Sequence, residues 1–89
     1  MNDNEPPPVW VIVGRVTRRK GGAESQVHVL LLAPDEDSAV RLTLNGLLRE
    51  GFAEAQLDQI GEMEGEPDEE PYLSAYQGAL EGEVAIVML

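Results

Sequence analysis

The sequence contains no cysteine, so it can form neither disulfides nor thiolate metal sites. With a single histidine, His28, and no G-x-S-x-G motif, it also lacks the residues of the usual nucleophilic triads. Its longest apolar runs, residues 9–13 and 27–33, are far shorter than the roughly 20 residues that a membrane helix needs. Because the first residues lack the features of a secretory signal, we expect a soluble cytoplasmic protein that does not act in a membrane.

Positive charge is scarce and lies only in the first part of the chain. The net charge is −11, and residues 51–89 contain ten acidic residues and no lysine or arginine. All six basic residues lie within residues 1–50, beside seven acidic ones. Phosphate binding needs lysine and arginine, so this distribution argues against nucleic acid as a partner. An acidic surface of this kind commonly keeps a small protein soluble.

Residues 8–33 predict two long strands that fold back on each other at Gly21-Gly22. Glycine accepts the positive φ angles of a two-residue hairpin turn, and Gly-Gly is therefore a strong turn signal. A turn at this pair places Arg15 opposite His28 and Val13 opposite Leu30. Apolar residues then meet apolar residues along both faces of the hairpin.

The remaining pattern predicts helix, strand, helix, strand. The first helix covers residues 36–50, with Asp35 as its N-cap and Gly51 as its end. Its expected apolar stripe consists of Ala39, Val40, Thr43, Leu44, Leu47 and Leu48. Residues 52–63 alternate as a half-buried strand and change phase near residues 59–61, where we expect a bulge or an early end. Residues 72–81 are predicted to form the second helix, whose apolar face is Tyr72, Leu73, Tyr76 and Leu80 with Ala75 and Ala79 at its edge. Residues 82–89 are predicted to form a last strand that is apolar on both faces.

These elements predict an α+β fold, a two-layer sandwich of a four-stranded mixed sheet with both helices on one face. The order along the chain is strand, strand, helix, strand, helix, strand. We expect one domain over residues 9–89, preceded by a disordered proline-rich tail over residues 1–8. Residues 62–70 form a mobile acidic loop.

Two groups of side chains are candidate binding sites. Arg15 and His28, opposed on one face of the hairpin, are a candidate anion-binding pair at the edge of a ligand pocket. The second group is acidic and is a candidate surface for a basic partner: Glu62, Glu64, Glu66, Asp68, Glu69 and Glu70. We expect no metal at this surface, because its spacing matches no calcium loop and two prolines restrict the backbone. No catalytic residue and no cofactor are indicated.

If both helices cover one face of the sheet, the other face remains apolar and exposed. That face comprises Val9, Val11, Val13, Leu30 and Leu32, and we expect it to mediate self-association as a homodimer. The leading hypothesis is therefore a small non-enzymatic interaction or regulatory domain that acts as a homo-oligomer. One alternative is an acidic inhibitor or immunity-type protein that binds a basic site on a partner. Another is a small-anion-binding domain or enzyme with a pocket at a subunit interface.

Overall fold

The computed structural model describes residues 8–89, so residues 1–7 of the expected tail lie outside the described residues. The predicted α+β class and the predicted order of elements are confirmed. In chain order the elements are β1 (Val9–Thr17), β2 (Ser25–Leu32), α1 (Glu36–Arg49), β3 (Glu54–Glu62), α2 (Tyr72–Leu80) and β4 (Ala85–Met88). The expected acidic loop begins after Glu62, because Glu62 still pairs with Trp10 of β1. Its mobility stays a prediction.

The four strands form one sheet in the order β3-β1-β2-β4, and every neighbouring pair is antiparallel. The expected mixed sheet is therefore wrong. Strands β2 and β3 do run in the same direction, as a crossover through α1 requires, but β1 lies between them. Because β1 is antiparallel to both, no parallel pair is formed.

The predicted two-residue turn at Gly21-Gly22 is wrong, because the loop between β1 and β2 covers residues 18–24. Arg15 pairs with Gln26 and Val13 with His28, two residues away from the expected register. The Gly22 N–H donates to the Arg19 carbonyl at 2.8 Å, and Gly21 takes a φ of 75° in that turn. A carboxylate oxygen of Glu54 in β3 accepts a hydrogen bond from the Gly21 N–H at 3.1 Å. This gives a partner to a loop N–H that the pairing of β1 with β2 does not use. A shift of two residues leaves every side chain on its predicted face.

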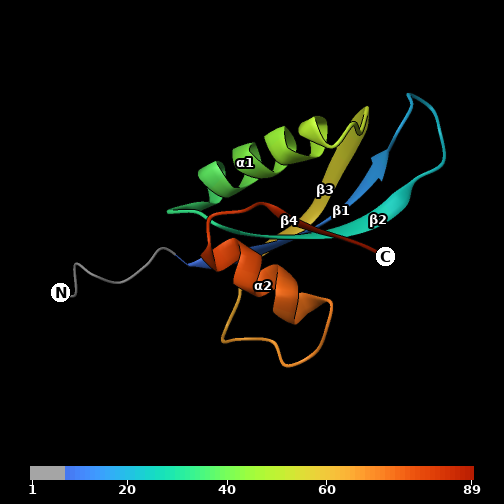
Figure 1. Ribbon diagram of the computed structural model, residues 1–89. Coiled ribbons are helices and arrows are strands. Elements are labelled where there is room, and N and C mark those ends of the chain that lie inside the picture. Colours follow the sequence, from blue (N-terminus) through green and yellow to red (C-terminus); the bar gives the residue numbers. More distant parts are fainter. Residues whose placement is uncertain (1–7) are drawn as a thin grey trace.

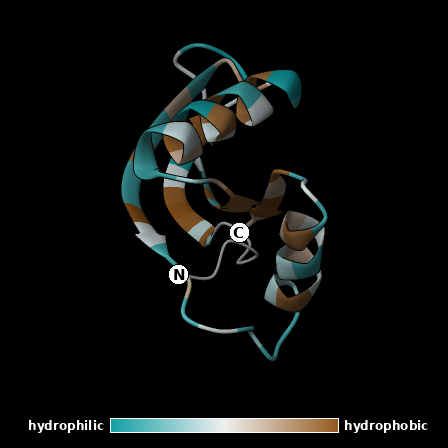
Figure 2. Cartoon of the chain, turned by 90° about the vertical axis from the view of Figure 1, so that its left-hand side faces the viewer, coloured by the Kyte–Doolittle hydropathy of each residue, from teal (hydrophilic) through white to brown (hydrophobic). Residues whose placement is uncertain are grey.

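The two helices lie on opposite faces of the sheet, so the expectation of both on one face is wrong (Figure 1). Helix α1 packs on the face that carries Trp10, Ile12 and Leu31. Helix α2 packs on the other face, against Val9 and Leu30. The reason is the path of the chain: α2 connects β3 at one edge of the sheet to β4 at the other edge, and it crosses the face that α1 leaves uncovered. Figure 2 shows the hydrophobic strand segments enclosed between the two helices.

Helix α1 starts and ends as predicted. The Asp35 carboxylate accepts a hydrogen bond from the Ser38 N–H at 2.8 Å, and Gly51, with a φ of 94°, follows the last turn. Its buried side chains form one narrow line, namely Ala39, Thr43 and Leu47. The stripe predicted from the helical period is wider than this line, because Leu44 and Leu48 are exposed. Gly46 instead faces Val84, the residue before β4.

The phase change in β3 is a real bulge, one residue earlier than predicted. The pairing with β1 shifts between Val13 and Gly14, where Asp58 is the extra residue. As a result Leu57 and Ile60, three residues apart, both pack on the α1 face. In α2 the small residues form the centre of the packed face and not its edge: Ala79 is buried, whereas Leu80 is 47% exposed. Small side chains allow α2 to lie close to the sheet.

Candidate functional site

Arg15 and His28 lie on the same sheet face, but each already has partners. The Arg15 Nε and Nη2 donate to the two carboxylate oxygens of Asp58 at 3.0 and 2.9 Å, and Nη1 lies 3.5 Å from Glu24. The hydrogen bond to Asp58, together with the Asp58 charge, raises the pKa of Arg15, and the same hydrogen bond lowers the pKa of Asp58. The His28 Nδ1 lies 2.8 Å from the Tyr72 hydroxyl of α2. An anion would have to displace two carboxylates from Arg15, so the structure does not form the expected pair.

The acidic candidate surface is exposed, with all six of its carboxylates at the surface. One of them has a structural role: Glu70 accepts from the Ser74 N–H at 3.0 Å and from the Ser74 hydroxyl at 2.7 Å, at the start of α2. Within residues 8–89, no group of three or more metal-ligating side chains could hold a metal ion. Glu69 and Glu70 directly precede Pro71, and Pro71 lines the groove described below.

The face expected to mediate self-association is an internal core. Val9 and Leu30 are buried, and Val11 and Leu32 pack with them against α2. Val13 is half-buried on the same face. The error has the same origin as the error in helix placement: a face that was thought to be bare is covered by α2. A dimer through this face would require α2 to leave the sheet.

The two edges of the sheet differ in how they are protected from other strands. Strand β3 forms one edge and carries the devices that normally prevent edge pairing, namely a bulge and charged residues such as Glu54 and Asp58. Strand β4 forms the other edge. Its residues, Ala85–Met88, are all apolar, contain no proline and show no irregularity in their pairing with β2. Within residues 8–89, β4 is protected by its short length, with no proline, charge or bulge of its own.

The register of β4 identifies the backbone groups that face outwards. The Leu89 N–H donates to the Gln26 carbonyl at 3.1 Å, directly across from it in the β2-β4 register. Hydrogen-bonded and non-bonded pairs alternate in an antiparallel ladder, so Val87 and Ala85 also bond to β2. Ile86 and Met88 therefore direct their N–H and C=O groups away from β2. Within the described residues, no other strand pairs with that side.

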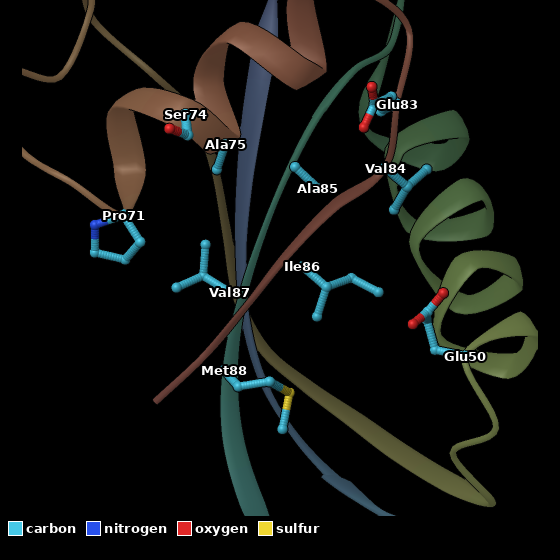
Figure 3. Close-up of a pocket in the computed structure, with 10 residues that line it drawn as sticks. All are labelled: Glu50, Pro71, Ser74, Ala75, Glu83, Val84, Ala85, Ile86, Val87 and Met88. Carbon is cyan, nitrogen blue, oxygen red and sulfur yellow. The ribbon is translucent and has the colours of Figure 1, made fainter.

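A groove of about 530 Å³ runs along this free edge, with one helix on each side (Figure 3). Glu50, at the end of α1, lies on one wall. Residues from the start of α2 form the opposite wall, namely Pro71, Ser74 and Ala75. Figure 3 shows Val84 and Ile86 directed towards α1, whereas Val87 points towards α2. The strand thus has an unpaired edge at the base of a groove between the two helices.

The charge in the groove is negative. Its only ionisable lining residues are Glu50 and Glu83, and no lysine or arginine lines it. All ion pairs within residues 8–89 involve Arg15, so neither carboxylate has an ion-pair partner there. Arg18 does approach Glu50, but it donates to the main-chain carbonyl at 3.2 Å and lies over the Phe52 ring. The Glu50 carboxylate consequently remains available to a cation in the groove.

Sequence reasoning predicted the last strand but missed the site at its edge. A run that is apolar on both faces indicates burial by two layers, and α1 and α2 supply those layers. It gives no information on which strand lies at an edge, because that depends on the pairing of all four strands. Glu50 and Glu83 are far apart in the sequence, and no motif connects them.

Comparisons of this chain with protein-family models, with curated proteins and with solved structures found no match. Among residues 8–89, no helix has both the length and the apolar character needed to cross a membrane. The geometry of the β4 edge is therefore the basis for a functional assignment.

Proposed function

We propose that this chain is a small non-enzymatic protein-interaction domain. It binds an extended segment of a basic partner protein, which adds to the sheet as a further strand beside β4. In this mode of recognition, main-chain hydrogen bonds supply affinity and the side-chain surroundings supply specificity. The observation that carries the proposal is the unpaired edge of β4, whose Ile86 and Met88 backbone groups open into the groove between the two helices.

Charge favours a basic partner over a second copy of this chain. Pairing two β4 strands would bring Glu50 and Glu83 of both copies to one interface, between two molecules that each carry a net charge of −11. Like charges brought together at an interface disfavour association, whereas opposite charges favour and accelerate it. The surface on which a homodimer was expected is covered by α2, so self-association has lost its main support.

The proposal is tested by removing one outward N–H without disturbing the fold. Met88 is 47% exposed and its N–H is not used by β2, so Met88→Pro removes an edge donor while the β2-β4 ladder remains. Met88→Ala is the matched control, since it removes the same side chain and keeps the N–H. The probe is the hexapeptide Lys-Val-Lys-Val-Lys-Val, titrated into the intact chain and followed by amide chemical shifts.

We expect the largest shifts at Ile86 and Met88 in the wild type, retained binding in Met88→Ala and loss of binding in Met88→Pro. Equal binding by Met88→Pro and Met88→Ala would contradict strand addition. A second result would also overturn the proposal: a wild-type dimer in sedimentation that Met88→Pro converts to a monomer. In that case the occupant of the edge is another copy of this chain.

A further inference from the structure

The two walls of the groove differ in chemistry, and this difference assigns a sequence pattern to the bound segment. Resting on the function proposed above, we infer that the segment alternates cationic and small apolar residues. Its lysine or arginine side chains face the α1 wall, and its small apolar side chains face the α2 wall.

The alternation follows from strand geometry. Successive side chains of a strand point to opposite faces of the sheet, and directly opposed residues of neighbouring strands share a face. In β4, Ile86 lies across from Val29 on the α1 face, and Ala85 lies across from Leu30 on the α2 face. A residue of the added strand opposite Ile86 therefore faces α1, and its two neighbours face α2.

The α1 wall favours a cation with a long side chain. Figure 3 shows the Glu50 carboxylate directed towards Ile86, so a lysine or arginine opposite Ile86 would extend towards it. The stem of such a side chain can lie along the exposed side of Ile86 while its charged end reaches the carboxylate. Arg18 is held by the Glu50 main chain and by Phe52. Arg49 lines the adjoining hollow beside Glu50, and no ion pair joins the two side chains within residues 8–89.

The α2 wall favours small apolar side chains. Pro71, Ser74 and Ala75 present little bulk and no charge to the groove. At its base Val87 is only 7% exposed, so an apolar residue of the added strand finds an apolar neighbour there. The loop carboxylate nearest in sequence, Glu70, has both oxygens directed at Ser74, whereas Pro71, Ala75 and Val87 give this wall its apolar lining.

The pattern is tested with two peptides of one composition, Lys-Val-Lys-Val-Lys-Val and Lys-Lys-Lys-Val-Val-Val, titrated into the intact chain. Both carry the same charge, so a difference between them reports the alternation. We expect the alternating peptide to bind at least about 5-fold more tightly, because only it places every valine on the α2 side. We also expect Glu50→Gln to weaken its binding by about 2- to 5-fold, the range for a partly exposed ion pair. Glu64→Gln, which removes the same charge from the exposed loop, is the control and should leave affinity unchanged.

The outcomes separate this inference from the proposed function. If both peptides shift Ile86 and Met88 with equal affinity, the alternation is refuted and strand addition stands. If Glu50→Gln and Glu64→Gln have the same effect, the cation does not face the α1 wall and the inference is overturned. If neither peptide shifts these amides, strand addition itself fails, and the inference fails with it.

Discussion

Replacing Gly46 of α1 with alanine tests how closely this helix approaches the strand that carries the proposed site. In an exposed helix interior, alanine in place of glycine stabilises a protein by about 1 kcal/mol. At Gly46, however, an added Cβ would lie 2.8 Å from Val84 Cγ1 and 3.3 Å from Val84 Cβ. Favourable carbon contacts begin at about 3.5 Å, and valine is stiff about χ1. Val84 therefore cannot easily move away.

We expect this overlap to outweigh the helix propensity. Overpacking a well-packed site typically costs about 1 to 3 kcal/mol, so Gly46→Ala should destabilise the protein by about 1 kcal/mol after the propensity gain is subtracted. In a Val84→Ala background the closest atom, Cγ1, is absent. The same substitution should then stabilise the protein by up to about 1 kcal/mol. The coupling between the two positions is accordingly about 2 kcal/mol.

The free energies come from urea unfolding of the wild type, both single variants and the double variant. Gly78→Ala in α2 is the matched control, because its Cβ would meet the flexible end of Glu83 at 3.4 Å and the Ala85 Cβ at 4.0 Å, both ordinary van der Waals contacts. It should be stabilising by about 1 kcal/mol. If Gly46→Ala stabilises the wild type as much as Gly78→Ala does, α1 does not approach β4 closely, and the groove between the helices has a different shape.

Two further predictions concern single polar groups. Thr43 is fully buried and, within residues 8–89, its hydroxyl has no hydrogen-bond partner, so Thr43→Val should raise the free energy of unfolding by about 1 kcal/mol. Thr17→Val should lower it, because the Thr17 hydroxyl donates to Glu54 at 3.0 Å; urea unfolding of both variants measures the contrast. The hydrogen bond from the Ser38 N–H lowers the pKa of Asp35 from its ordinary value of 3.8, so the charged form stabilises the fold and this contribution is lost as the pH falls below 3.8. Asp35→Asn keeps an N-cap but does not titrate, and stability measured against pH should therefore fall less steeply in this variant below that value; an unchanged slope would contradict the assignment.

Local features of the sequence determined where the elements lie. Asp35 and Gly51 bound α1 because a capping carboxylate and a glycine with positive φ act within one turn of the helix. The phase change after Leu57 indicated the bulge in β3, because a period of two cannot place Leu57 and Ile60 on one face without an extra residue. Each of these features depends on interactions between residues that are a few positions apart in the sequence, so the sequence alone is enough to predict them.

Tertiary structure decided which surfaces are covered and which remain free. The hairpin is apolar on both faces, and this pattern is satisfied equally by a second copy of the chain or by a second helix. The structure places α2 on the Val9 and Leu30 face, because the chain must cross from β3 at one edge to β4 at the other. The same pairing of distant strands leaves the backbone of Ile86 and Met88 without a neighbour and brings Glu50 beside it. Periodicity states which side chains share a face, but only the pairing of all four strands determines what covers that face and which edge stays open.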